Sequence, residues 1–474
     1  MSAFSPGRIV LASLFASAMT TATPAMAGEA LDGARLPWPL ALPFAGILLS
    51  IALGPLAVKE WWHIHYEKAA GFWAILALGG LIAVEGLPAA AASFVHSMAL
   101  QYLPFILMLF AFYTAAGGIG VEGRLNGSPS VNTSILAFGA AIANIIGTTG
   151  ASMILIQPLI RANSARPFNA HVMVFFIFLV STLGGVLTPL GNPPLFLGYL
   201  KVIDFFWTAC ALWPQAVFTV ATLLVIFFLV DSYFYRREKG IRPATAGVMK
   251  LRVSGLANIG LMGIAILAIA ASGFWRPGIG FEVLGTRIEL QNLLREAVMA
   301  AVGLASLRLT NPGLRVANGF EWEPIREVGY LFAGIFICII PVMAMLAAGA
   351  KGPFSAAIDV LTREDGTPDN AVYFWATGIL SSFLDNAPTY LVFFQLAGGD
   401  PSALMGPLAK TLMAISLGAV FMGANTYIGN APNFMVYAIA RRAGVNMPGF
   451  FPYMIWSGAI LFPVFAALTW LFLM

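Results

Sequence analysis

The chain has 474 residues, of which 59% are hydrophobic and only 10% are charged. Soluble domains carry about 25% charged residues, so this composition excludes a soluble enzyme. It predicts an all-α polytopic membrane protein whose main partner is the lipid bilayer. The net charge of +4 is small, and the basic residues lie mostly between apolar stretches, which indicates membrane topology and no nucleic-acid partner. Cys210 and Cys338 have no metal-binding or redox spacing.

The N-terminus has the pattern of a secretory signal peptide, predicted over residues 1–27. Arg8 precedes an apolar segment at 9–19, and Ala25-Met26-Ala27 forms a small-residue cleavage site. The apolar segment is short for a membrane span, which favours cleavage over the alternative of an uncleaved first helix. We therefore expect a multi-pass protein of the bacterial inner (plasma) membrane, with residue 28 on the periplasmic side.

Apolar stretches long enough to cross a bilayer follow along the chain. A membrane helix needs about 20 such residues, and a shorter stretch at 297–307 must extend into its flanks. The uninterrupted stretches are 36–57, 71–90, 102–120, 212–231, 255–273, 328–348 and 450–473. Four more are long but interrupted by Gly, Pro, Asn or Asp: 133–161, 172–200, 371–397 and 411–440.

Charge predicts how these stretches are arranged. The basic loop 231–252 should be cytoplasmic, which requires that one earlier stretch does not cross. We predict that 133–161 and 371–397 are re-entrant hairpins opening to opposite faces, and that 172–200 and 411–440 are broken transmembrane helices. The chain then forms an inverted repeat of residues 28–230 and 255–474, joined by a cytoplasmic linker at 231–254.

A repeated motif supports this arrangement. Residues 188–199 read TPLGNPPLFLGY and residues 426–437 read TYIGNAPNFMVY, so that Thr, Gly, Asn, Pro, Phe and Tyr recur at a constant offset of 238 residues. A helix broken inside a bilayer exposes backbone groups that cost several kcal/mol each if unsatisfied. Such breaks persist where protein, water or a ligand pairs them. The motif predicts ion or substrate contacts at Asn192, Asn430, Thr188, Thr426 and Asn425, although a purely structural break is the alternative.

Asp385 is the most specific single candidate, because it lies within apolar sequence at the break of 371–397. A carboxylate at membrane depth costs about 2.5–3.5 kcal/mol on insertion scales and is a candidate ion ligand or proton carrier. Asn386 and Ser382 add oxygens that suit a hard cation such as Na⁺, so Asp385 and Asn386 form a predicted sodium site. A compatible structural alternative is that Asp385 caps the following half-helix.

The break of 133–161 has a different chemistry. Asn144, Thr148 and Thr149 offer neutral ligands, and Gly147 occupies the position equivalent to Asp385. The alternative is that the hydroxyls bond back to helix carbonyls, as is common in membrane helices.

These motifs resemble the ion transporter superfamily, which includes sodium/proton antiporters, arsenite permeases, and citrate and dicarboxylate carriers. The similarity is strongest to a bacterial family of citrate transporters and sodium:proton antiporters, from about residue 36 to the end. It implies ion or substrate contacts at the tips and breaks, an elevator-like motion of the hairpin domain, and often a homodimer. The implied contacts are Asp385, Asn386, Thr148, Thr149, Asn192 and Asn430. Dicarboxylate carriers repeat Ser-Asn-Thr at both hairpin tips, and this chain has it at neither.

Two functions remain open from the sequence. The first is a sodium/proton antiporter in which Asp385 binds Na⁺ or H⁺ alternately by alternating access. The alternative is a cation-coupled transporter of citrate or another small organic anion. The sequence has no Walker loop, dinucleotide fingerprint or nucleophile elbow, so we expect no enzymatic activity and no cofactor beyond Na⁺ or H⁺.

Overall fold

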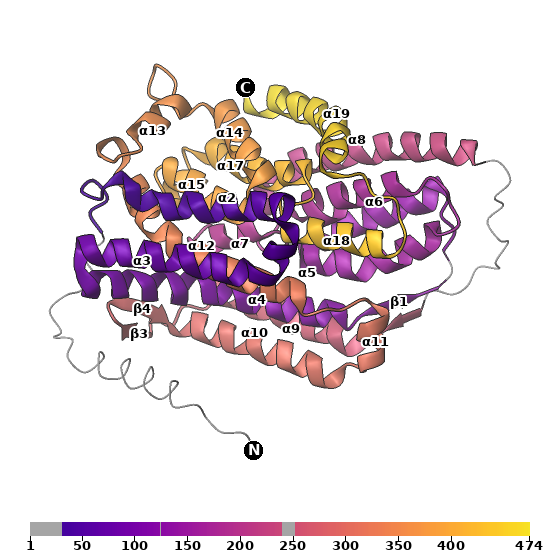
Figure 1. Cartoon of the computed structure of the whole chain (residues 1–474), viewed down its shortest axis with the longest axis horizontal. Coiled ribbons are helices and arrows are strands. Elements are labelled where there is room, and N and C mark those ends of the chain that lie inside the picture. The colour runs from indigo at the N-terminus through magenta and orange to yellow at the C-terminus, as the bar shows by residue number, and fades with distance from the viewer. Residues whose placement is uncertain (1–30, 124, 239–251) are drawn as a thin grey trace.

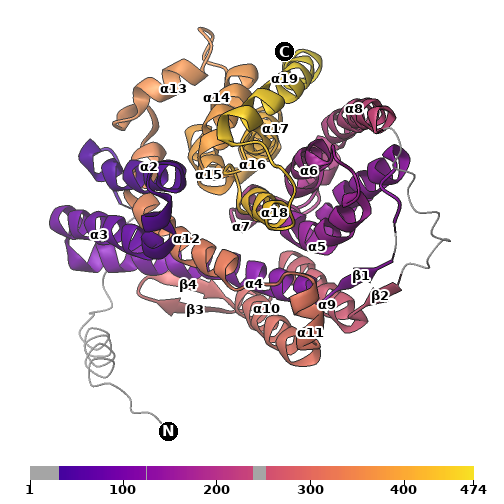
Figure 2. The same cartoon turned by 45° about the vertical axis from the view of Figure 1, so that its right-hand side comes forward.

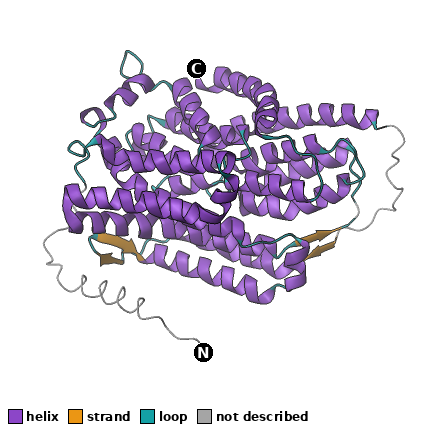
Figure 3. Ribbon diagram, in the orientation of Figure 1, coloured by secondary structure: helices purple, strands orange, loops and turns teal. Residues whose placement is uncertain are grey.

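A computed structural model describes residues 31–123, 125–238 and 252–474. The predicted signal peptide and residues 239–251 of the predicted linker lie outside these ranges. The described chain is mostly helical, with two short antiparallel strand pairs (Figure 3). β1 (Gly120–Glu122) pairs with β2 (Arg252–Ser254), and β3 (Gly280–Val283) pairs with β4 (Thr286–Glu289).

The helices fall into two groups (Figures 1 and 2). We call the first group the frame. It consists of α2 (Leu42–Ala57), α3 (Lys59–Ser97), α4 (Leu103–Gly117), α9 (Leu256–Phe274), α10 (Leu290–Leu309) and α12 (Glu323–Ala347). Its strongest contacts join α12 to α3 and α10 to α4.

We call the second group the bundle. Its first part consists of α5 (Pro129–Asn163), α6 (Ala170–Phe176), η3 (Ile177–Thr182), η4 (Leu183–Gly185), α7 (Pro193–Leu200) and α8 (Trp207–Arg237). Its second part consists of α14 (Asn370–Phe383), α15 (Asn386–Leu396), α16 (Pro401–Met405), α17 (Ala409–Phe421), η6 (Met422–Asn425), α18 (Ala431–Arg442) and α19 (Phe450–Leu468). Short helices η1 (Trp38–Ala41), η2 (Met98–Tyr102), α11 (Pro312–Ala317), η5 (Gly349–Lys351), α13 (Ser355–Leu361) and η7 (Thr469–Leu473) complete the described chain. The frame and the bundle meet where α4 packs against α5 and α12 packs against α15.

Seven of the described helical runs are long and apolar enough to cross a membrane, which makes this a multi-pass membrane protein. The two predicted spans at 71–90 and 102–120 belong to one run, Lys59–Gly117. That run reverses direction near Gly86, whose φ is +83°. Tyr66 and Tyr113 both bond near the start of α12, to Glu323 and Glu321, whereas Ser97 bonds to Phe336. The short stretch predicted at 297–307 extends into the 20 residues of α10.

Several predicted boundaries need correction. α8 continues to Arg237, so the predicted linker at 231–254 begins inside a helix. The helix breaks also begin earlier than the Gly-Asn motif, at Leu183 in one case and at Met422 in the other. The reason is that the chain tightens into 3₁₀ turns before the motif, where small residues such as Gly184 and Gly423 allow it.

A buried ionic cluster fixes one end of the bundle. Asp231, on α8, accepts hydrogen bonds or ion pairs from Arg166 (2.7 Å), His171 (2.8 Å) and Asn132 (2.9 Å). Arg166 also pairs with Glu238 at 3.0 Å. The carboxylate of Asp231 is completely buried. The cluster therefore joins α5, α6, α8 and the connection between α5 and α6.

Candidate functional site

The segment around Gly147 is a sharp reversal inside α5, which we call the first tip (residues 144–149). Gly147 has φ +77°, a conformation that L side chains rarely adopt. Asn132 and Asn163, at opposite ends of α5, hydrogen-bond to each other at 2.9 Å. A straight helix of 35 residues would be about 50 Å long, so α5 doubles back on itself at Gly147.

The segment between α14 and α15 forms a second reversal, which we call the second tip (residues 382–388). The Tyr373 hydroxyl near the start of α14 donates to the Leu396 carbonyl at the end of α15 (3.2 Å). Asp385 is half-buried, and its Oδ1 accepts the Ala387 N–H at 3.0 Å, so it caps α15. Among the described residues, its second carboxylate oxygen makes no hydrogen bond, so capping uses only half of this group.

Each tip is tied to a helix break by the same hydrogen bond. We call residues 182–192 the first break and residues 422–430 the second break. The Thr188 hydroxyl donates to the Asn144 carbonyl, and the Thr426 hydroxyl donates to the Ser382 carbonyl at 2.6 Å. The members of each pair are 44 residues apart, and the pairs are related by the offset of 238 residues. The repeat seen in the sequence is thus also a repeat of backbone geometry.

Glycine pairs close both breaks. A Cβ built on Gly191 would lie 2.1 Å from the carbonyl oxygen of Gly185, and one on Gly429 would lie 2.4 Å from that of Gly423. Both distances are too short for a side chain. The glycines at these positions are therefore required by the close approach of two backbone segments.

We expect Gly191→Ala to lower the yield and the melting temperature of the detergent-purified protein, because the rigid Gly185 carbonyl must move. Gly260, in the exposed part of α9, has no atom within 4 Å of an added Cβ. Gly260→Ala is the matched control and should be neutral or slightly stabilising, since Ala is favoured over Gly in a helix by about 1 kcal/mol. Equal melting temperatures for the two variants would contradict the packing described for the first break.

One chain of hydrogen bonds connects the two halves of the site. Asn386 Nδ2 donates to Asn192 Oδ1 (2.9 Å), and Asn192 Nδ2 donates to the Thr182 carbonyl (3.0 Å). Thr182 Oγ1 then donates to Asn433 Oδ1 (2.7 Å), and the Asn433 N–H donates to Asn430 Oδ1 (3.0 Å). The second tip, the first break and the second break are therefore linked by successive hydrogen bonds that use both side-chain and backbone atoms.

The remaining candidates join this network at its edges. Thr148 N donates to the Gly191 carbonyl at 3.0 Å, which links the first tip to the first break. Asn425 Nδ2 donates to Ser382 Oγ at 2.8 Å. Two candidates lie outside this network: the Thr149 side chain makes no hydrogen bond to the described residues, and Asp385 bonds only to Ala387 and Thr389.

The sequence analysis missed Thr182 and Asn433, which form the bond between the two breaks. Asn433 lies three residues after Asn430 in the repeated motif, but its counterpart in the first copy is Leu195, so the repeat gives no signal. Thr182 precedes the glycine pair Gly184-Gly185. The recurrence of small residues before each motif is the only sequence signal that could have drawn attention to it.

Three buried polar atoms at the site have no hydrogen-bond partner among the residues that the structure describes. They are the amide oxygens of Asn386 and Asn425 and the amide nitrogen of Asn430. These residues are 0%, 4% and 3% exposed. An unsatisfied buried polar group costs about 1–3 kcal/mol. The two amide oxygens are therefore available to bind a cation. The amide nitrogen is available to donate a hydrogen bond to a solute.

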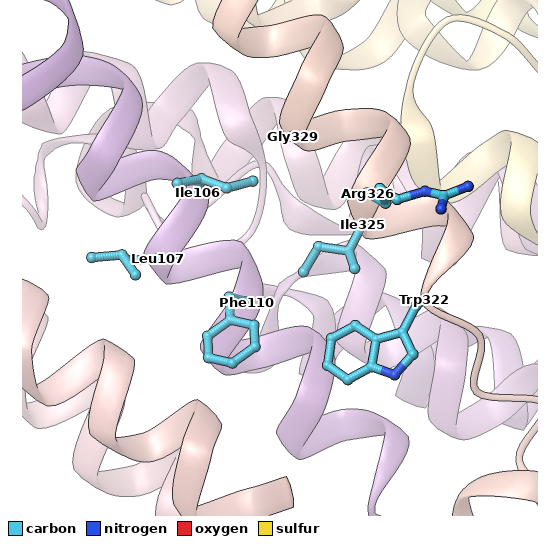
Figure 4. A pocket seen from close by; sticks show the side chains of 7 residues that line it. All are labelled: Ile106, Leu107, Phe110, Trp322, Ile325, Arg326 and Gly329. Atoms are coloured by element: carbon cyan, nitrogen blue, oxygen red, sulfur yellow. The ribbon is translucent and has the colours of Figure 1, made fainter. Parts of the chain in front are cut away.

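A groove on the frame lies away from the tips and breaks. It has a volume of about 390 Å³, lies between α4 and α12, and is lined mainly by apolar side chains such as Ile106, Phe110 and Trp322 (Figure 4). Arg326 is its only charged lining residue, and the groove shares none of its lining residues with the tips or breaks. It belongs to the frame and offers a small polar solute almost no hydrogen-bonding group.

Comparison with known proteins agrees with a transporter. The model of a family described as "Putative citrate transport" matches residues 33–473. Uncharacterized transporters of Mycobacterium bovis and Mycobacterium tuberculosis are each 25% identical to this chain over 375 residues, which cover 76% of this chain and 80% of the relative. This is a family of transporters and not of enzymes. Because the family model matches nearly the whole described chain, the protein belongs to the citrate transport family.

Proposed function

We propose that this protein is a cation-coupled membrane transporter of citrate or another small organic anion that works by alternating access. The observation that carries the proposal is the set of unpaired buried amide atoms on the network of the tips and breaks. Membership of the citrate transport family supports the anionic substrate. The sequence hypothesis of a sodium/proton antiporter becomes the second candidate.

The cation site is proposed at the second tip. Asn386 and Asn425 each present an unpaired amide oxygen, and Asp385 has a carboxylate oxygen that the α15 cap does not use. Asp385 is the only charged residue in the tips and breaks. Oxygen donors of this kind suit a hard cation such as Na⁺, and the carboxylate would supply the compensating charge.

The anion site is proposed on the opposite side, between the first tip and the second break. The Asn430 amide nitrogen is an unpaired donor, and the Thr148 and Thr149 hydroxyls belong to a tip without an acid. A substrate carboxylate would be repelled by a second Asp at this position. The glycine at 147, where the other half has Asp385, therefore suits an anionic solute next to a bound cation.

The proposed membrane arrangement is an inverted repeat in which the two tips enter from opposite faces as re-entrant hairpins. The reversal of α5 at Gly147 and the reversal at the second tip support it. So does the repetition of the Thr188 and Thr426 hydrogen bonds. Residues 28–230 and 255–474 would be the two repeats, with frame and bundle each built from both.

Uptake of labelled citrate into proteoliposomes tests this function. An inward Na⁺ or H⁺ gradient should accelerate uptake. Unlabelled citrate, tricarballylate or succinate should reduce the uptake of labelled citrate to the extent that each binds the same site. Absence of gradient-driven uptake for every carboxylate tested would rule the proposal out.

The antiporter is favoured by a single observation, which is that one lone carboxylate serves the whole site. An antiporter moves Na⁺ against H⁺ without any organic anion. Proton flux driven by a Na⁺ gradient in vesicles free of carboxylates would therefore establish antiport, and flux that requires the anion would establish the carrier.

A further inference from the structure

The repeated motif ends in a tyrosine in both halves, but the two tyrosines make different contacts. The Tyr199 hydroxyl, at the end of α7 in the bundle, bonds to the Ile269 carbonyl and to Ser272 Oγ of α9 in the frame, each at 2.9 Å. Tyr437, at the equivalent position of α18, stacks on Tyr427 at 4.0 Å and donates to the Pro448 carbonyl (3.1 Å). One tyrosine therefore ties the bundle to the frame, whereas the other stays within the bundle.

The frame contains two equivalent hydrogen-bonded serines, and one of them, Ser272, is the partner of Tyr199. Ser272 Oγ accepts a hydrogen bond from Arg295 of α10 at 3.4 Å, and Ser50 Oγ of α2 accepts one from Trp73 Nε1 of α3 at 3.0 Å. Each donor lies 23 residues after its serine, and the two pairs are related by a constant offset of 222 residues. α2 and α9 are thus equivalent helices of the frame that carry equivalent serines.

Ser50 has a hydrogen-bonding position that is not used among the described residues. A hydroxyl has one donor and two acceptor positions. Ser50 donates to the Gly46 carbonyl (2.7 Å) and accepts from Trp73, which leaves one acceptor position. The equivalent serine, Ser272, shares a hydrogen bond with the Tyr199 hydroxyl in which either oxygen can be the donor. The Ser50 side chain is only partly buried.

We infer that Tyr199 and Tyr437 are positioning residues that hold two alternating arrangements of the bundle against the frame. In the arrangement described here, Tyr199 is docked on Ser272 and Tyr437 is stacked on Tyr427. In the opposite arrangement Tyr437 docks on Ser50 and Tyr199 leaves Ser272. The exposed ion pair (2.5 Å) between Arg442 of α18 and Glu321, which precedes α12, must then open. This inference rests on the alternating access of the proposed function, but it does not depend on the solute.

Cross-linking of paired cysteines tests the exchange. In a background with Cys210→Ser and Cys338→Ala, one variant carries Tyr199→Cys with Ser272→Cys, and a second carries Tyr437→Cys with Ser50→Cys. A short bifunctional thiol reagent should join each pair, and each cross-link should stop transport. In a protein carrying all four cysteines, formation of one cross-link should prevent the other.

Conservative variants add a readout that a purely structural role would not move. Tyr199→Phe removes one hydroxyl and should raise the yield of the 437–50 cross-link about two- to tenfold, as expected for the loss of one hydrogen bond. Tyr373→Phe is the matched control, because the Tyr373 hydroxyl bonds only within the bundle, to the Leu396 carbonyl.

The outcomes separate this inference from the proposed function. The exchange is overturned if either cross-link fails to form under all ion and solute conditions. It is also overturned if both cross-links form in one molecule. If wild-type protein transports citrate but positions 437 and 50 never cross-link, the exchange is wrong and the transport function stands. If each cross-link forms and prevents the other, but no carboxylate is transported, the exchange stands and the substrate assignment fails.

Discussion

Asp385→Asn should greatly weaken cation-driven transport at low cation concentration while leaving the protein folded. Asn caps a helix about as well as Asp, so the hydrogen bond to the Ala387 N–H at 3.0 Å can be kept. The substitution removes only the negative charge, which is the sole charge in the tips and breaks. Interactions with a charged group contribute about 1.5–3 kcal/mol, so the apparent affinity for the coupling cation should fall about 10- to 150-fold. Initial uptake rates at several cation concentrations measure this change.

The matched control is Asp400→Asn. Asp400 caps α16 in the same manner, accepting the Ser402 N–H at 2.9 Å, but it belongs to neither tip nor break. This variant should transport like the wild type. If both variants transport normally at low cation concentration, Asp385 is only a helix cap. If both lose activity, the loss is not specific to the second tip, and the assignment of the coupling cation to Asp385 is wrong.

Asp231→Asn should strongly destabilise the protein, because Asp231 is the carboxylate on which the buried cluster converges. Among the described residues, its loss leaves Arg166 with Glu238 at 3.0 Å as the one remaining anionic partner and leaves His171 without an anionic partner. Breaking a buried ion pair by removing one partner costs about 3–5 kcal/mol. The melting temperature of the purified protein in detergent should therefore fall well below that of the wild type.

An exposed ion pair provides the comparison. Asp32 pairs with Arg35 at 3.1 Å, with side chains 56% and 85% exposed. Exposed pairs contribute about 0–1 kcal/mol, so Asp32→Asn should hardly change the melting temperature. A small shift for Asp231→Asn as well would mean that the buried cluster does not hold α5, α6 and α8 together.

Much of the architecture follows from local features of the sequence. Composition predicts a multi-pass helical membrane protein, because apolar runs of about 20 residues have few other uses. The Gly-Asn-x-Pro motifs predict breaks, because proline and glycine act on the backbone where they stand. Asp385 is predicted as a cap by its place before a proline-containing helix start, and the structure confirms this capping bond. Each of these properties depends on residues within a few positions of one another.

The tertiary structure alone decides which polar groups meet. Asn386 bonds to Asn192 across 194 residues of chain, and Thr182 bonds to Asn433 across 251. No local pattern encodes such partners, because they depend on how helices from both halves pack. Packing also decides which amide atoms remain buried without a partner. The sequence by itself determined the class of protein, the repeat and which apolar stretches are broken. Only the folded chain determined the network that joins them, because hydrogen bonds between distant segments require those segments to be brought together.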